Sequence, residues 1–407
     1  MNCRFCKATL ELEFIDLINS PASNSYLSNQ QLNEPEIFYP LKVFVCESCF
    51  LVQIDEYKRF DSIFDNNYAY FSSFSTSWLE HCKNYVEQMT TLLNLNEQSQ
   101  VIEIASNDGY LLQYFLPKHI KVLGIEPTKN TAEIAVLKGI PCITEFFGTI
   151  LAHQLQEKQI KADLLIGNNV LAHVPDIVDF VRGLKIVLQH EGVITMEFPH
   201  LLELVTNSQF DTIYHEHFSY LSLYTVGKIF ESQGLRIFKV DKLTTHGGSI
   251  RIYATHQESK RLTEDSYEEV LKEELKAGMD NRKYYINFNA KVMKIKLDLL
   301  NFLVQAKLNG KHVAAYGAAA KGNTLLNYCG VKSDMIDFVV DANPVKQRKF
   351  LPASHIPIVG EEEIKNQKPD YVLILPWNLK DEITKQLRYI HDWNGQFVIP
   401  IPHLEVI

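Results

Sequence analysis

Residues 214–220, with the sequence Y-H-E-H-F-S-Y, bring side chains suited to proton transfer into one short run. The run contains two imidazoles, one carboxylate and two phenols. A buried strand would avoid such a sequence, because each polar group needs a hydrogen-bond partner once it leaves water. The run therefore predicts a cluster of proton-transfer groups in a cleft. A polar turn without a catalytic role is the alternative that this segment alone leaves open.

Four of the seven cysteines form two C-x-x-C pairs, Cys3 with Cys6 and Cys46 with Cys49. A tight turn at each pair would aim both sulfurs at one point, and two such turns supply the four thiolates that a structural zinc ion requires. The long segment between the pairs is tolerable because the entropy of loop closure grows slowly with length. Four unrelated buried cysteines are the alternative. Four protein thiolates would leave no open position on the metal for chemistry.

Composition limits the classes of function. The chain has 407 residues and a formal net charge of −9, which argues against a nucleic-acid-binding protein with its usual basic face. No apolar run approaches the roughly 18 residues of a membrane span, and residues 1–6 lack the apolar core of a signal peptide. The sequence thus predicts a cytoplasmic protein of several domains, without nucleic-acid or membrane partners.

Strands and helices alternate in residues 100–200, and these elements must position the reactive side chains. Such a succession is typical of a parallel, doubly wound α/β sheet, whose ligands bind at the carboxyl ends of the strands. Strands are expected at residues 100–105, 121–126, 140–143, 162–166 and 192–197, and helices at residues 129–138 and 178–188 and from residue 110.

The loop after the first strand, E-I-A-S-N-D-G at residues 103–109, has one glycine where a dinucleotide fingerprint has three. Pyrophosphate is therefore not expected there. An acid after the second strand, Glu126, could accept both ribose hydroxyls. Together these features resemble the S-adenosylmethionine site of class I methyltransferases, although its usual glycine-rich loop is reduced here to Gly109. The resemblance implies that Glu103, Asn107 and Asp108 line the cofactor site.

The segment after the fourth strand also fits that resemblance. Asn168 and Asn169 correspond to cofactor-lining positions, and His173 would lie just past the strand end, facing the cleft. A capping histidine before a helix is the alternative for His173. Residues 235–240 and 249–253 alternate as an antiparallel pair that would close the sheet. The glycines at residues 247–248, between these strands, allow a close backbone approach to a ligand.

The remaining chain is expected to form a helical connector at residues 258–308 and a second, Rossmann-like α/β domain at residues 309–407. A small-residue turn at residues 317–322 leads into a helix, with Lys321 beside the helix N-terminus. Backbone N–H groups and a lysine there predict an anion site, most plausibly for a diphosphate. A purely structural turn is the alternative.

Taken together, the order of these motifs resembles the sugar C-methyltransferase family, represented by the C-3′-methyltransferases of dTDP-4-keto-6-deoxysugars. The resemblance covers essentially the whole chain. It implies a zinc module at residues 1–60, a methyltransferase domain at residues 61–257, and a C-terminal domain that helps bind the nucleotide sugar. It carries over the four cysteines as zinc ligands, a catalytic set of His217, Tyr214, Glu216, His173 and Tyr68, and substrate contacts from Tyr70, His246, Arg251, Lys321 and Asn323.

The implied reaction uses His217 as the base that removes the acidic proton beside a keto group. Tyr214 or His173 would donate a hydrogen bond to the enolate oxygen, and Glu216 would orient a histidine or bind a sugar hydroxyl. For His215 we expect only a structural hydrogen bond. Two alternatives stay open, an O- or N-methyltransferase of small molecules and a non-catalytic zinc scaffold. We expect a monomer or a weak homo-oligomer.

Overall fold

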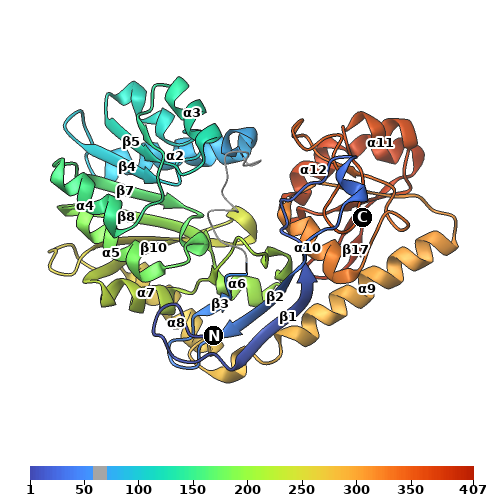
Figure 1. The fold of residues 1–407 in the computed structure, drawn as a ribbon, viewed down its shortest axis with the longest axis horizontal. Coiled ribbons are helices and arrows are strands. Elements are labelled where there is room, and N and C mark those ends of the chain that lie inside the picture. The colour runs from blue at the N-terminus through green and yellow to red at the C-terminus, as the bar shows by residue number, and fades with distance from the viewer. Residues whose placement is uncertain (58–70) are drawn as a thin grey trace.

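The computed structural model describes residues 1–57 and 71–407, and this part of the chain forms three β-sheets. Figure 1 shows a large α/β unit on the left and a smaller one on the right, with the N-terminal strands and helix α9 (Phe288–Leu308) running between them. The predicted tyrosines Tyr68 and Tyr70 lie outside the described residues.

The largest sheet has seven strands in the order β10-β11-β8-β7-β4-β5-β6. All neighbouring pairs are parallel except those that involve β11, which is antiparallel to both β8 and β10. The predicted parallel sheet and its antiparallel closing pair are thus confirmed. The strands are β4 (Gln100–Ile104), β5 (Lys121–Ile125), β6 (Cys142–Ile143), β7 (Ala162–Asn168), β8 (Leu188–Pro199), β10 (Leu235–Leu243) and β11 (Ser249–His256).

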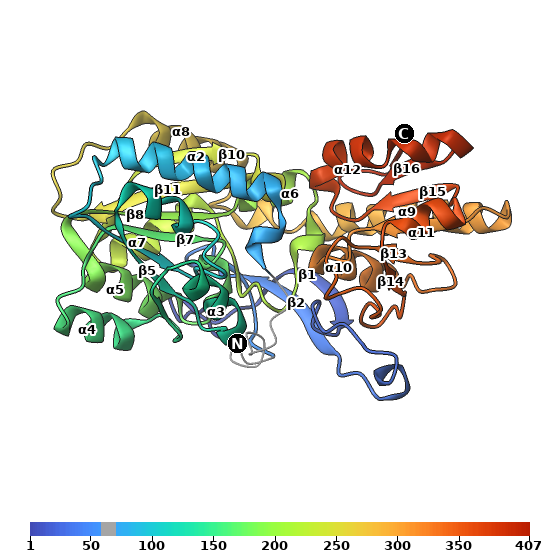
Figure 2. The same cartoon turned by 90° about the horizontal axis from the view of Figure 1, so that it is seen from above.

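Helices cover both faces of this sheet, as Figure 2 shows for α2 on one side and α4 and α5 on the other. Successive strand residues face opposite sides, so Val101 packs with the α2 layer and Ile102 with the α4 and α5 layer. Ser75 caps α2 by accepting a hydrogen bond from Trp78 N, and Asp176 caps α5 in the same way. The covering helices are α2 (Thr76–Leu92), α3 (Lys129–Leu137), α4 (Thr149–Glu157), α5 (Ile177–Val187) and α7 (Leu223–Ser232).

The helix predicted from residue 110 is wrong. This segment forms two short 3₁₀ turns, η3 (Leu112–Tyr114) and η4 (Leu116–Lys118). Pro117 has no N–H, and in an α-helix its ring would clash with the carbonyl of Gln113. The turns still bury Leu111 and Phe115 against the sheet, so the apolar pattern was informative although the element type was not.

The N-terminal sheet is antiparallel, with the order β1-β2-β3-β9. Its last strand does not come from the N-terminal residues, because β9 directly follows the Y-H-E-H run. The predicted zinc module therefore includes a strand from within the predicted methyltransferase domain. The strands are β1 (Leu12–Ser20), β2 (Tyr39–Val45), β3 (Val52–Ile54) and β9 (Ser219–Tyr220).

The C-terminal sheet has the order β14-β13-β12-β15-β16-β17, parallel apart from the last pair. The Rossmann-like α/β domain expected at residues 309–407 thus contains a mainly parallel sheet. The elements are β12 (Val313–Tyr316), β13 (Val339–Val340), β14 (Ile358–Val359), β15 (Tyr371–Ile374), β16 (Gln396–Ile399), β17 (Glu405–Val406), α10 (Ala320–Cys329), α11 (Glu362–Gln367) and α12 (Lys380–Gln386).

Helices α8 (Asp265–Ala277) and α9 lie within residues 258–308. One continuous apolar cluster joins the N-terminal sheet, α9 and the C-terminal sheet. Phe14 of β1 stacks on Phe288 of α9 with ring centroids 4.5 Å apart. This shared core fixes the N-terminal strands against the C-terminal unit. Within the described residues, no helix combines the length and apolar character needed to cross a bilayer.

Candidate active site

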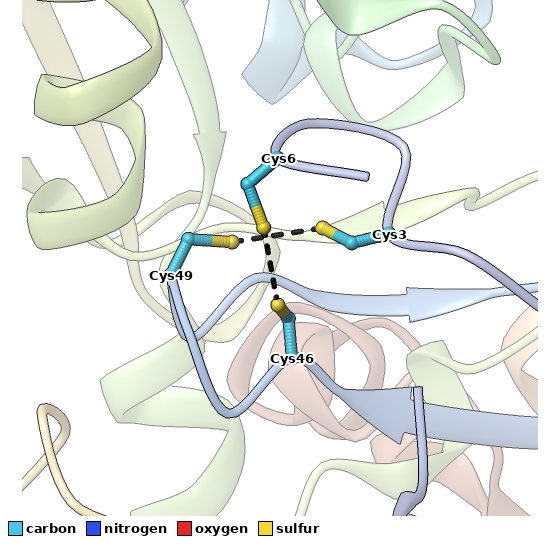
Figure 3. A group of neighbouring side chains, drawn as sticks. All are labelled: Cys3, Cys6, Cys46 and Cys49. Atoms are coloured by element: carbon cyan, nitrogen blue, oxygen red, sulfur yellow. Dashed lines mark hydrogen bonds between the residues drawn. The ribbon is translucent and has the colours of Figure 1, made fainter. Parts of the chain in front are cut away.

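The four predicted zinc ligands come together at the N-terminus (Figure 3). Their sulfur atoms all lie within 4.8 Å of one another, with Cys3 Sγ 3.6 Å from Cys49 Sγ and Cys6 Sγ 3.4 Å from Cys46 Sγ. Four sulfurs at about 2.3 Å from one tetrahedral zinc ion would lie roughly 3.8 Å apart. Gln53 Nε2 donates to Cys3 Sγ at 3.2 Å, which suits a thiolate. The site therefore fits a closed, structural zinc ion.

The first zinc-binding turn also contacts the catalytic region. Arg4 donates through Nη1 to Pro175 O at 2.6 Å and through Nη2 to Ile54 O at 2.5 Å. Its guanidinium lies 5.3 Å from the centroid of the Phe218 ring. The metal module thus supports the segment that carries the Y-H-E-H run.

The loop after β4 has the backbone of a glycine-rich loop without its composition. Ala105, Asn107 and Gly109 have φ angles of 57°, 47° and 73°, so every second residue is left-handed. These are the three positions that glycines would occupy in the usual methyltransferase loop. The positive φ of Gly109 favours glycine, and a Cβ there would also have to displace Ile140 Cδ1, which would lie 2.4 Å away. The loop therefore differs from the usual glycine-rich loop in its residue types and not in its conformation.

Buried acceptor oxygens gather around this loop. Asp108 Oδ1, Asn168 Oδ1 and Asn169 Oδ1 have no hydrogen-bond partner among the described residues, and the buried Glu103 carboxylate has Tyr110 as its neighbour. Burial raises the pKa of Glu103, the Tyr110 hydrogen bond lowers it, and the nearby Glu126 and Asp108 raise it further. A cluster of unsatisfied acceptors favours a cationic ligand. S-adenosylmethionine fits, because it carries a sulfonium and an ammonium group.

Glu126 lies at the carboxyl end of β5, as predicted. Its Oε2 accepts from Asn107 N and its Oε1 from Thr128 N, both at 2.8 Å. Burial raises its pKa, while these hydrogen bonds act in the opposite direction. The Thr128 hydroxyl also donates to Oε1, so three of the about four acceptor sites of the carboxylate are filled and one remains for a ribose hydroxyl.

The rings of His173, His217 and Tyr214 lie together. The His173 and His217 centroids are 4.6 Å apart, and the Tyr214 and His217 centroids 4.1 Å apart. His217 Nδ1 lies 2.8 Å from Thr212 O, and His173 Nδ1 lies 2.7 Å from Glu216 O. A carbonyl only accepts, so each Nδ1 carries the hydrogen and each neutral ring presents Nε2 as an acceptor.

Burial keeps both imidazoles neutral. It lowers the pKa of His173 to about 4, although the hydrogen bond to Glu216 O acts in the opposite direction. It also lowers the pKa of His217 well below the ordinary value, and the nearby His173 and Lys321 lower it further. In contrast, His215 Nε2 lies 3.1 Å from Pro40 O, so the structural hydrogen bond expected for this residue is present.

Two predicted substrate contacts, His246 and Lys321, join Asn169 to the C-terminal unit. His246 Nε2 lies 2.9 Å from Asn169 Nδ2, and Lys321 Nζ donates to His246 O at 3.2 Å. Lys321 also lies 4.9 Å from the ring centroid of Trp377, whose Nε1 donates to the buried Asp211 Oδ2 at 2.7 Å. Burial lowers the pKa of Lys321 and raises that of Asp211 to about 6. Lys321 and Asp211 therefore place a cationic group and an acidic group beside the histidines.

Two other predicted substrate contacts have structural partners instead. Arg251 is buried, and its Nη2 donates to Glu197 Oε2 at 2.6 Å. Burial raises the pKa of Glu197, but a hydrogen bond with His81 and the charge of Arg251 outweigh it and lower the pKa to about 2. Asn323 is also buried, and its Nδ2 donates to Ser23 O at 2.5 Å. The sequence could not reveal these partners, which lie 54 and 300 positions away.

Comparison with known proteins shows the family of this chain. Three family profiles match the chain: a zinc binding domain at residues 3–64, a methyltransferase domain at residues 79–240 and a C-methyltransferase C-terminal domain at residues 244–402. C-methyltransferase NovU of Streptomyces niveus is 32% identical over 405 residues, covering 100% of this chain and 96% of the relative. This chain belongs to the zinc-containing C-methyltransferase family.

Two solved structures each resemble less than half of this C-methyltransferase. The PH0226 protein of Pyrococcus horikoshii OT3 covers 46% of this chain and 95% of its own, at 12% identity and a TM-score of 0.39. Magnesium protoporphyrin IX methyltransferase of Synechocystis PCC 6803, with bound SAH, covers 44% and 82%, at 15% identity and a TM-score of 0.34.

The family assignment makes the chain an S-adenosylmethionine-dependent methyltransferase and not a non-catalytic scaffold. Its strand order is that of a class I methyltransferase, and the zinc module and second α/β unit flank it as predicted. Sequence reasoning missed Asp211 and Trp377, because neither stands in a recognisable motif. It also missed Asn24, which contacts Glu216 from the far end of the chain.

Proposed function

We propose that this C-methyltransferase transfers a methyl group to C-3′ of a nucleotide-linked 4-keto-6-deoxysugar through an enolate. The observation that carries the proposal is the neutral His217 ring, whose Nδ1 is engaged by Thr212 O and whose Nε2 is left as an acceptor. A carbon acid beside a ketone needs such a base near neutral pH, and an oxygen or nitrogen nucleophile needs it far less. A positioned base contributes about 10²–10⁴ in rate.

The enolate oxygen would receive its hydrogen bond from Tyr214. The neutral His173 ring is a poor donor for this purpose, because its Nδ1–H already points at Glu216 O. The Tyr214 ring stacks obliquely on His217 at 4.1 Å, which would bring its hydroxyl near the carbonyl whose neighbouring carbon loses the proton. An oriented donor of this kind stabilises negative charge only as it develops.

The bound cofactor supplies an electrophilic methyl group. The protein's part is to orient it and to exclude water. The acceptors of Glu103, Asp108, Asn168 and Asn169 would hold its cationic groups, and Glu126 would hold the ribose. His173 follows Asn168 and Asn169 along the chain and lies beside His217, so the base and the methyl donor would share one crevice.

The nucleotide part of the substrate would bind across the α10 turn. Helix α10 has ten residues and no side-chain cap at its N-terminus, so its first N–H groups are available to an anion. Lys321, in the first turn, adds a positive charge and already contacts the His246 loop. We take dTDP as the first choice of nucleotide and the cytoplasm as the place of action, with a monomer or weak homo-oligomer as the working form.

The test is an activity screen with methyl-labelled S-adenosylmethionine and dTDP-, GDP- and CDP-linked 4-keto-6-deoxysugars. We expect transfer to the dTDP sugar, and no transfer to a matched sugar whose C4 keto group has been reduced to a hydroxyl. Equal transfer to the reduced sugar would remove the enolate from the account and favour O-methylation.

A further inference from the structure

The segment between β1 and β2, residues 21–38, forms an arm that reaches the C-terminal unit; Figure 1 shows it in blue beside α10. Leu27 and Phe350 exchange backbone hydrogen bonds of 3.0 and 2.8 Å. Near the other end of the arm, Glu36 accepts from Ala353 N at 3.0 Å and pairs with His355 Nε2 at 2.5 Å. The arm is therefore fastened to the C-terminal unit at two separate points.

The arm also touches the turn that leads into α10. The Tyr26 hydroxyl donates to Ala318 O at 2.6 Å, and Asn323 Nδ2 donates to Ser23 O at 2.5 Å. Tyr26 is buried, and Lys346 lies 5.4 Å from its ring centroid and donates to the same Ala318 O at 2.8 Å. Residues 23 and 26 of the arm thus bracket the proposed diphosphate turn.

Asn24 lies between these two contacts and faces the catalytic run. Its Nδ2 donates to Glu216 Oε1 at 2.7 Å, while its Oδ1 lies 3.2 Å from the Tyr26 hydroxyl. The acceptor-only carboxylate fixes which end of the Asn24 amide faces Glu216. A hydrogen bond to a carboxylate is charge-assisted and therefore stronger than one between neutral groups.

Glu216 accepts hydrogen bonds at two of its atoms, and the two donors belong to different parts of the molecule. Its carbonyl oxygen accepts from His173 Nδ1, and its side chain accepts from Asn24. The next residue is His217, and His217 N donates to Tyr214 O at 2.9 Å within the same turn. A change at the Glu216 side chain would therefore be passed to both imidazoles.

We propose that Asn24 is a positioning residue for the methyl transfer, and that residues 23–26 of the arm link the α10 turn to the catalytic turn through Glu216. For the identity of the substrate, this proposal rests on the function proposed above. Asn24 acts on the reaction through Glu216. Because Ser23 and Tyr26, on either side of Asn24, contact α10 and the turn before it, a ligand that orders that turn would also order the catalytic turn.

The test compares Asn24→Leu, which keeps the side-chain size but removes both polar ends, with Asn29→Ala, an exposed residue of the same arm. We expect Asn24→Leu to lower kcat by about 10- to 100-fold, as small displacements of catalytic groups do, with little change in the KM for S-adenosylmethionine. Asn24→Asp, which puts a second carboxylate against Glu216, should lose at least as much. Tyr26→Phe should raise the KM for the nucleotide sugar more than it lowers kcat.

Hydrogen exchange by mass spectrometry provides a readout that needs no substrate. In Asn24→Leu, peptides spanning residues 212–220 should exchange faster than in the wild type, whereas Asn29→Ala should leave them unchanged. Unchanged exchange in Asn24→Leu, or a kcat equal to that of the wild type, would overturn the proposal. If the wild type methylates none of the sugars, the proposed function fails, and the exchange data still decide the role of Asn24. Asn24→Ser replaces Asn24→Leu if the latter does not fold.

Discussion

The His173 and His217 rings meet edge to face with centroids 4.6 Å apart, and each Nδ1 lies against a backbone carbonyl. The carbonyl that holds His173 belongs to Glu216, the residue before His217, so the two imidazoles are fixed by one turn. This arrangement fixes the tautomer of each ring, with the hydrogen on Nδ1. It leaves His217 Nε2 as the acceptor that proton removal from carbon requires.

Replacing the proposed base should affect turnover and not cofactor binding. We expect His217→Asn to lower kcat by about 10²- to 10⁴-fold, the usual contribution of a general base. Isothermal titration with S-adenosylmethionine should give an affinity close to that of the wild type. The matched control is His190→Asn on the exposed surface, which should retain full activity. Full activity of His217→Asn would remove this residue from the mechanism.

The pH profile should reflect the lowered histidine pKa values. A base must be neutral to accept a proton, so kcat/KM rises with pH through the pKa of His217. Burial, His173 and Lys321 all lower that pKa below the ordinary value of about 6.5. The acid limb should therefore lie below pH 6.5, with a flat region above it.

Lys321→Met removes a positive charge beside His217 and should move this acid limb to higher pH. The exposed Lys332→Met serves as the control and should leave the limb in place. A limb that does not move in Lys321→Met would show that the lysine exerts no field on the base.

Loss of the proposed ribose contact should weaken cofactor binding. Glu126→Gln removes charge-assisted hydrogen bonds, each worth about 1.5–3 kcal/mol, so the Kd for S-adenosylmethionine should rise by roughly tenfold or more. The exposed Glu133→Gln on α3 is the control. Binding measured by calorimetry would contradict the assignment if both variants matched the wild type.

Removing zinc should destabilise the N-terminal sheet and reduce activity indirectly. Strand β9 pairs with β3 and follows the catalytic turn directly, while Arg4 of the first zinc-binding turn lies beside Phe218. We expect Cys46→Ser to lose the metal and to lower Tm by roughly 5 °C or more. Cys142→Ser, outside the cluster, should keep one zinc ion per chain. Calorimetry and metal analysis check both variants, and a Tm unchanged after complete metal loss would contradict a structural role.

Much of the fold could be predicted because strand alternation is local. The antiparallel strands β10 and β11 show the alternation of apolar residues, and the helix predicted at residues 178–188 corresponds to α5. The helix predicted from residue 110 was wrong because Pro117 prevents an α-helix there, although the apolar residues have helical spacing. The pairing of β9 with β3 was not foreseeable, since a two-residue strand carries no periodic signal.

Local signals in the sequence predicted the cysteine cluster and the acid after β5, because both depend on residue type at short spacing. The loop after β4 keeps a left-handed backbone with one glycine, because Ala105 and Asn107 adopt the conformation that glycine usually supplies. The contact of Asn24 with Glu216 joins residues 192 positions apart, and only the fold brings them together.

The most direct test of the central claim is the structure of the product. The enzyme would be incubated with a dTDP-linked 4-keto-6-deoxysugar and S-adenosylmethionine labelled with carbon-13 in its methyl group, and the product followed by NMR. We predict a methyl singlet on a quaternary carbon, together with loss of the hydrogen on C3. A labelled methyl with the shift of an O-methyl group, and a C3 hydrogen still in place, would contradict the account.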